Sequence, residues 1–419
     1  MELAPGRGSG GGGGRHRGQS IAAPIHADGD AAPRLLPPAG KLPDLALHVL
    51  GAARGRKSRP PGLRLLRRLE RAGGANPPAA VNVLNALAKA YEERGEFRQA
   101  EKLYRSSLRV LEKAPRDAEI ERFRALSLGN LAAVHRVQGR NAMAERLLRR
   151  GLAMARESCG PGSLDVATLL NHLAVLRKYQ GRFAEAGRLY RRALAITEKA
   201  LGPEHPDVAS IYHNLGGLEH AWGRYARGEP FARQAVAIRE KLLGPDHPEV
   251  AADVAALAAI LDGQGRYDEA EALYRRAIAA FRRRFGREHY ELAVNFNNLA
   301  ALHQAKGNGR QAERLYKRAL AIKEKILGPM HADVAMTLNN LAVLYKAQGR
   351  LRMAEPLYRR AAVIFRKSLG PAHPNLATCL RNHASLLRQM NRTSEASRLE
   401  ARVRSFRGPR SRRPGMPQA

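Results

Sequence analysis

The sequence predicts an all-α protein, an α-solenoid of about eight helix pairs forming a right-handed superhelix between basic, disordered ends. Two observations carry this prediction: one motif recurs at a fixed spacing, and each copy contains two apolar stripes with helical periodicity. The alanine that closes the segment reading DVA, EVA, ELA or NLA recurs every 42 residues, at Ala167, Ala209, Ala251, Ala293, Ala335 and Ala377. A period of this length indicates stacked helical units, each of which buries its apolar face against its neighbours.

The first helix of the unit is clearest in the copy spanning residues 327–367, where it is expected over 334–348. Its apolar residues follow a spacing of three or four, which places them on one buried stripe: Val334, Leu338, Leu341, Ala342 and Tyr345. Gly349 ends this helix, because glycine readily adopts the left-handed conformation of a helix cap. The same turn position holds Gly95, Gly139, Gly181, Gly223, Gly265, Gly307 and, in the eighth unit, Asn391.

The second helix is expected over residues 353–368, before Gly370 and Pro371 stop it. Ala354 on this helix and Ala342 on the first are small enough to let neighbouring helices approach closely. The second-helix alanine recurs at Ala100, Ala144, Ala186, Ala270, Ala312, Ala354 and Ala396, with Gly228 once. These positions define eight helix pairs between about residues 79 and 403.

The repeated unit resembles tetratricopeptide repeats, specifically the 42-residue variety of kinesin light chains and nephrocystin-3. The resemblance lies in the segments NNLAxLY (339–345), QGR (348–350), AEPLYRRA (354–361) and LGPxHPDVA (201–209), and it covers about three quarters of the chain. It implies a peptide-binding adaptor. A kinesin light chain is also expected to carry heptads before its repeats, and residues 1–78 contain none.

The segments outside the repeats differ in composition. Residues 1–60 are rich in Gly, Pro and Arg and are expected to be disordered, since they cannot bury enough apolar surface to offset the ordering entropy. Residues 61–78 would hold a short capping helix at 63–71 and a linker, 79–403 the solenoid, and 404–419 a basic disordered tail. The expected location is the cytoplasm. The alternatives are a mitochondrion or chloroplast, through an Arg-rich transit segment, and the nucleus, through the basic tails.

Composition argues against several classes of protein. The two cysteines, Cys159 and Cys379, stand alone without a CxxC or Cys/His run, so neither a disulfide framework nor a zinc site is expected. No apolar stretch is long enough to suggest a transmembrane helix. The net charge is +34, of which residues 1–75 carry +8 and residues 401–419 carry +6. Most of the excess therefore lies on the repeats themselves.

No residue pattern predicts catalysis or a cofactor. The glycine run from Gly8 to Gly14 lacks the GK[ST] of a phosphate-binding loop. Five histidines recur in the linkers, at His205, His247, His289, His331 and His373. One repeat separates each from the next, whereas a shared metal needs ligand bonds of about 2 Å. We therefore expect each histidine to hydrogen-bond the adjacent helix end.

The first helices are expected to line a concave groove that binds an extended peptide. The residue before the core leucine is asparagine in five of eight repeats, at Asn130, Asn214, Asn298, Asn340 and Asn382. A carboxamide both donates and accepts, as a peptide backbone requires, and the position resembles the clamp asparagine of tetratricopeptide domains. The alternative is that these asparagines bridge adjacent repeats.

Six residues further along the same helices, four of the eight residues are cationic: Arg136, Lys178, Lys346 and Arg388. These cations would select an acidic segment of a protein partner, as the grooves of kinesin light chains do by resemblance. A solvated role for each remains the alternative.

The second helices carry paired cations that favour a rival function, binding of nucleic acid or another polyanion. However, a glutamate usually precedes the first cation by four residues, an orientation that favours ion pairing within the helix. The predicted pairs are Glu101 with Arg105, Glu145 with Arg149, Glu229 with Arg233, Glu271 with Arg275, Glu313 with Lys317 and Glu355 with Arg359. The sequence thus predicts a non-enzymatic interaction scaffold. A nucleic-acid-associated or organelle-targeted factor and a kinesin-light-chain-like cargo adaptor are the alternatives.

Overall fold

The computed structural model describes residues 76–93, 96–371 and 373–406, and every regular element among them is an α-helix. The first helices of the pairs are α3 (Pro77–Glu93), α5 (Ala118–Val137), α7 (Leu164–Tyr179), α9 (Pro206–Ala221), α11 (Pro248–Gly263), α13 (Tyr290–Ala305), α15 (Ala332–Ala347) and α17 (Pro374–Gln389). The second helices are α4 (Phe97–Glu112), α6 (Asn141–Cys159), α8 (Phe183–Leu201), α10 (Tyr225–Leu243), α12 (Tyr267–Phe285), α14 (Gly309–Leu327), α16 (Leu351–Leu369) and α18 (Thr393–Ser405).

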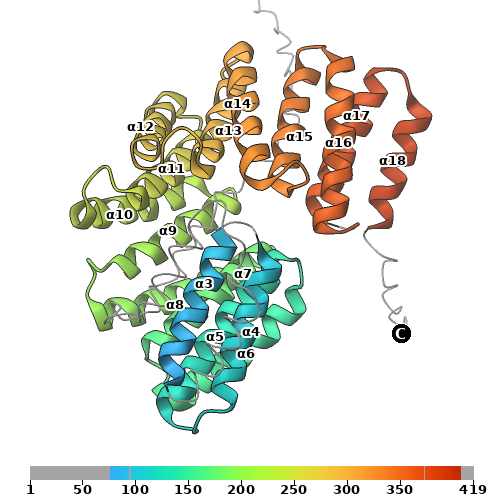
Figure 1. Cartoon of the computed structure of the whole chain (residues 1–419). Coiled ribbons are helices and arrows are strands. Elements are labelled where there is room, and N and C mark those ends of the chain that lie inside the picture. The colour runs from blue at the N-terminus through green and yellow to red at the C-terminus, as the bar shows by residue number, and fades with distance from the viewer. Residues whose placement is uncertain (1–75, 94–95, 372, 407–419) are drawn as a thin grey trace, which may run out of the picture.

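These helices stack as consecutive antiparallel pairs along a curved path, from α3 in blue to α18 in red (Figure 1). The predicted all-α solenoid of helix pairs is therefore confirmed. The first described helix begins at Pro77 and the last ends at Ser405. The expected disordered start, the capping helix at 63–71, the turn residue Gly95 and the tail beyond residue 406 lie outside the described residues.

The turns follow the sequence prediction closely. The second predicted helix, 353–368, corresponds to α16, and the first, 334–348, corresponds to α15 with its start two residues earlier. The turn glycines have positive φ, for example 74° at Gly349, and Asn391 is the one described non-glycine residue with positive φ, at 60°. Asparagine therefore replaces glycine at the cap of α17, as its tolerance of the left-handed region predicts.

The core consists of successive buried clusters along the stack rather than one central cluster. Ala342 and Ala354 are both fully buried, as their predicted role in close helix packing requires. Large buried tyrosines recur on the second helices, among them Tyr190, Tyr274 and Tyr358. Each repeat thus packs alanines and aromatic rings against the next repeat, and contiguous stacking is what stabilises the chain.

The linker histidines cap the first helices, as predicted. The Nδ1 atom of each accepts a hydrogen bond from the backbone N–H two residues later, at distances of 3.1 to 3.3 Å in His205, His247, His289, His331 and His373. Ser163 serves the same role for α7, where its hydroxyl oxygen accepts from the Val166 N–H. A periodic histidine is therefore a helix cap here.

Candidate peptide-binding surface

The five predicted clamp asparagines divide into two groups by burial. Asn214, Asn340 and Asn382 are 1%, 0% and 9% exposed, whereas Asn130 and Asn298 are half-buried. The three buried side chains lie between repeats, and little of their surface is left for a ligand. This distribution departs from a groove lined evenly by all five carboxamides.

The buried asparagines connect neighbouring repeats through side-chain hydrogen bonds. Asn214 Nδ2 donates to Asn171 Oδ1 of the preceding repeat at 3.0 Å, and Asn382 Nδ2 donates to Asn339 Oδ1 at 3.2 Å. Asn340 accepts at 3.4 Å from Asn339 beside it. The bridging role considered from the sequence thus describes Asn214 and Asn382. The asparagine period does not point to the acceptors Asn171 and Asn339. Each stands one position before the clamp position of its repeat, which His172 and Asn340 occupy.

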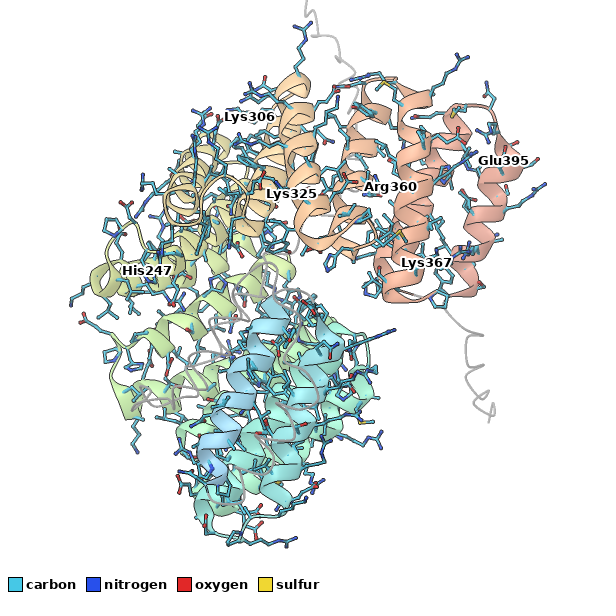
Figure 2. All side chains as sticks on the ribbon, in the orientation of Figure 1. His247, Lys306, Lys325, Arg360, Lys367 and Glu395 are labelled. Atoms are coloured by element: carbon cyan, nitrogen blue, oxygen red, sulfur yellow. The ribbon has the colours of Figure 1, made fainter. Side chains whose placement is uncertain are left out.

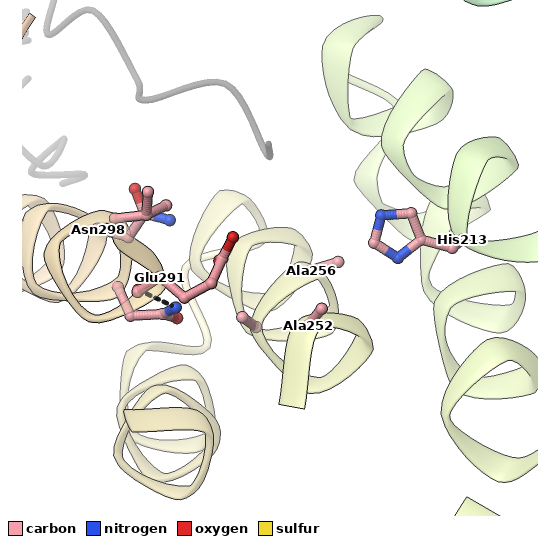
Figure 3. A pocket seen from close by; sticks show the side chains of 8 residues that line it. His213, Ala252, Ala256, Glu291 and Asn298 are labelled. Atoms are coloured by element: carbon pink, nitrogen blue, oxygen red, sulfur yellow. Dashed lines mark hydrogen bonds between the residues drawn. The ribbon is translucent and has the colours of Figure 1, made fainter. Parts of the chain in front are cut away.

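Asn298 lines a small notch between three successive first helices. His213 of α9 lies on one side, Ala252 and Ala256 of α11 form the floor, and Glu291 and Asn298 of α13 lie on the other side (Figure 3). The notch has a volume of about 30 Å³, enough for one water molecule. It exists because α11 has alanines at positions where neighbouring repeats have larger side chains.

A buried ionic network lies beneath this notch. Asp253 of α11 accepts two 2.7 Å hydrogen bonds from Arg239 Nη1 of α10, and its Oδ1 lies 2.7 Å from His213 Nδ1 of α9. Arg239 Nη2 also donates to Ser210 Oγ of α9 at 2.6 Å. The network joins three helices, so the backbone under the notch is fixed by side chains that sequence inspection had not identified.

The cations Arg136 and Lys178 gather around an exposed aromatic ring. The Arg136 guanidinium lies 4.6 Å from the centre of the Tyr179 ring, and Lys178 Nζ lies 5.4 Å from the same point. The Tyr179 side chain is 47% exposed. The cations of two neighbouring repeats thus lie beside the same ring, and cation–π contacts with Tyr179 hold them there.

Two histidines beside these cations are held uncharged at neutral pH. Burial, followed by the charges of Arg136 and Lys89, lowers the pKa of His172 to about 4. Burial and then Lys178 lower the pKa of His220 to about 4. His172 and His220 occupy the clamp position and the cation position of their repeats. These two imidazoles therefore add no positive charge beside Arg136 and Lys178 at neutral pH.

The other two predicted cations contact polar side chains of α17 and α18. Lys346 is half-buried and donates to Ser385 Oγ at 2.7 Å, and burial lowers its pKa. Arg388 is exposed and forms a 2.8 Å ion pair with Glu400 of α18. The four cations do not form one cluster: Arg136 and Lys178 are brought together, whereas Lys346 and Arg388 lie further along the stack.

All six predicted glutamate–cation pairs on the second helices are formed, with N···O distances of 2.5 to 2.8 Å. Several of the same glutamates also bind a cation of the following repeat. Lys306, labelled in Figure 2, donates to Glu271 at 2.9 Å and to Asp268 at 2.7 Å. The outer arginines are thus largely neutralised by neighbours, which argues against a continuous polyanion-binding surface there.

The described residues hold no group of three or more His, Cys, Asp or Glu side chains placed to bind a metal ion. None of the described helices is long and apolar enough to cross a membrane.

Comparison with known proteins identifies the repeated unit. The tetratricopeptide repeat family model matches residues 123–198, 165–241, 207–283, 250–325, 290–362 and 333–407, and a second tetratricopeptide repeat model matches 83–119. No curated protein sequence matches the chain.

Solved structures with similar repeats include two of the kinesin light chain type. TPR-like repeats of a Podospora anserina kinesin light chain are 26% identical, with 50% of this chain and all of that chain covered and a TM-score of 0.42. BtubC (BKLC) from P. vanneervenii is 28% identical, with coverages of 57% and 93% and a TM-score of 0.43. A Rap protein complexed with competence and sporulation factor is 16% identical, with coverages of 81% and 98% and a TM-score of 0.54, a likeness of fold.

Proposed function

Because the chain belongs to the tetratricopeptide repeat family, whose repeats support protein–protein interaction, we propose that it is a non-enzymatic scaffold that binds an extended, acidic segment of a partner protein. The surface of the first helices α5 to α9 would make the principal contacts. The observation that carries the proposal is the pairing of Arg136 and Lys178 around the exposed Tyr179 ring.

Charge complementarity supports an acidic ligand at this place. Arg136 and Lys178 are positioned by the ring, so less side-chain entropy is lost when they bind carboxylates. Asn130 lies six residues before Arg136 on α5 and is half-buried, so its carboxamide is the nearest candidate to hold a ligand backbone. Asn298 offers a second carboxamide beside the notch. Lys346 and Arg388 would bind carboxylates of a longer ligand in place of their present partners, Ser385 and Glu400.

The buried asparagines are poor targets for a test of binding, because their loss would also weaken the contacts between repeats. Removing the Asn340 or Asn382 carboxamide would leave buried polar groups unsatisfied, at a cost of about 1–3 kcal/mol each. We therefore place the test on residues whose side chains reach solvent.

The test uses the full chain with an array of 15-residue peptides that differ in net charge. Wild type should retain acidic peptides, and the double variant Arg136→Glu/Lys178→Glu should weaken their binding at least tenfold. The matched control Arg366→Glu/Lys367→Glu makes the same charge change on the exposed face of α16 and should have little effect.

Two results would count against the proposal. Equal losses in both double variants would mean that only the overall charge matters. Retention that falls steeply with salt, is shared by oligonucleotides and survives Asn130→Ala with Asn298→Ala would indicate a polyanion-binding protein instead.

A further inference from the structure

On the outer side of the stack, one carboxylate recurrently joins two cations. In α14, Glu313 pairs with Lys317 at 2.8 Å and with Arg350 of the next repeat at 2.6 Å. In α16, Glu355 pairs with Arg359 at 2.5 Å and with Arg392 at 2.8 Å. The same arrangement of one glutamate, the cation four residues later and a cation of the following repeat occurs around Glu101, Glu145, Glu229 and Glu271.

The arrangement is interrupted once between α4 and α16, at Gly187 of α8. This glycine occupies the glutamate position of its repeat, and both expected cations are present: Arg191 four residues later and Arg224 in the next turn. Arg191 Nη2 lies 3.6 Å from the position that a Cβ atom on Gly187 would take. Within the described part of the chain, neither arginine forms an ion pair with a carboxylate.

A second departure from the repeat holds Arg224 in place. Trp222 stands where other repeats have glutamine, as at Gln180, Gln264 and Gln348, and its ring centre lies 3.3 Å from the Arg224 guanidinium carbon. The Trp222 ring in turn contacts Phe183 at 5.7 Å between centres. A guanidinium stacked in this way keeps its in-plane N–H groups available for an anion.

The nearest acid by repeat register is Glu219 of α9. It occupies the position from which Arg177 and Tyr345 bind the recurring glutamate of the preceding repeat. Glu219 is 8% exposed, and its Oε2 atom is buried without a hydrogen-bond partner among the described residues. It does not pair with Arg191 or Arg224. The two arginines therefore lack the carboxylate that six other repeats supply.

We propose that Arg191 and Arg224 form an anion-binding site for a carboxylate of an acidic protein segment. The bound carboxylate would take the place of the side chain missing at Gly187, as the glutamates do elsewhere in the stack. The site lies on α8 and the α9–α10 turn (green in Figure 1), and it depends on none of the predicted clamp asparagines. It is a second contact surface, beyond the one proposed on the first helices.

The test exploits Trp222, the single tryptophan of the chain, whose emission reports on this site alone. The full chain is titrated with hexaglutamate at low ionic strength, where exposed charges are least screened. A saturable change in emission is expected for wild type, and the affinity of a labelled hexaglutamate is measured in parallel by fluorescence anisotropy.

Gly187 offers a matched pair of variants. A Cβ atom there would meet only Leu218 and Arg191, at 3.5 and 3.6 Å, which is ordinary van der Waals contact. Gly187→Glu restores the internal carboxylate and should weaken hexaglutamate binding at this site at least fivefold, with no loss of thermal stability. Gly187→Gln has the same size without the charge and should stay within twofold of wild type.

Several results would overturn the site. Equal weakening by both variants would show that size, and not charge, matters. Absence of binding in wild type by both readouts, or binding that emerges only in Glu219→Gln, would show that Glu219 already satisfies the arginines. An oligothymidylate of equal charge that binds more tightly than hexaglutamate and is lost in Gly187→Glu would reassign the site to phosphate.

Discussion

Single buried charges show how the repeat tolerates polar side chains in its interior. Arg239 and Lys323 occupy the same position two repeats apart, and both are buried. Arg239 is paired with Asp253, whereas the equivalent partner of Lys323 is Thr337, whose Oγ1 lies 3.1 Å from Nζ. Burial lowers the pKa of Lys323, because the charges of Asp333 and Glu291 only partly offset the lost hydration of its ammonium group.

Lys323→Met should therefore stabilise the protein at neutral pH, by about 1–3 kcal/mol in the free energy of unfolding. Because the folded pKa lies below the usual value of 10.5, wild-type stability rises with pH through the interval between the two, and the variant lacks this rise. Urea unfolding at pH 7 and pH 9.5 measures both effects. Lys367→Met, an exposed control, should change neither, and a destabilised Lys323→Met would refute the argument.

Residue-level prediction from the sequence succeeded where a side chain acts within its own repeat. The glutamate–cation pairs and the histidine caps follow from spacing along one helix or one turn. It left two roles open where the partner lies in the preceding repeat: Asn214 and Asn382 donate to Asn171 and Asn339, 43 residues earlier. An exposed groove and a buried inter-repeat bond require the same carboxamide periodicity, so the sequence alone could not separate them.

At the scale of the helix, the linker histidine fixes where the first helices α9, α11, α13, α15 and α17 begin. Its Nδ1 atom accepts from a backbone N–H that no carbonyl within the helix can satisfy. A serine performs this role at the start of α7. The cap is therefore defined by an acceptor atom at one position rather than by the imidazole itself.

His247→Ala should cost about 1 kcal/mol of unfolding free energy, whereas His247→Ser should recover most of it. The histidine is half-buried in the loop before α11, where its side chain reaches solvent (Figure 2). Thermal unfolding of the two variants decides the matter. If serine and alanine destabilise equally, the imidazole contributes through packing and not through its acceptor.

Helix positions and turns could be predicted almost to the residue, because two helices and two glycine caps recur every 42 residues. Residues that occur in only one repeat contributed little to that prediction, because a repeat is recognised from the residues that recur in every copy. Tyr179, Gly187 and Trp222 each depart from their column of the repeat. These departures mark the proposed contact surfaces, and they become informative only once the helices that bring them together are known.

At the scale of the whole molecule, many cations of the repeats belong to ion-pair networks. Hydrogen bonds from Arg177 and Arg350 lower the pKa of Glu145 and Glu313 to about 2 each. Both carboxylates join neighbouring repeats, so the ion pairs act along the entire stack. Part of the basic composition of the repeats thus serves to connect one repeat to the next.

Acid should weaken these connections in a defined interval. A carboxylate with a depressed folded pKa contributes stability that is complete above its usual value of 4.5 and is lost as the pH falls through about 2. Stability should therefore decline between pH 4.5 and 2, more steeply in wild type than in Glu313→Gln. Guanidinium unfolding across this range tests the prediction, and parallel curves for the two proteins would contradict it.

The Asp253 network also has a mechanical consequence. A solenoid bends by summing small rotations at successive junctions between repeats. At the junction of α9, α10 and α11, buried Asp253 is bound to side chains of both preceding helices, whereas an inter-repeat ion pair such as that of Glu313 with Arg350 is partly exposed to solvent. Bending of the solenoid should therefore occur mainly in the repeats before and after this junction, and the junction itself should stay rigid.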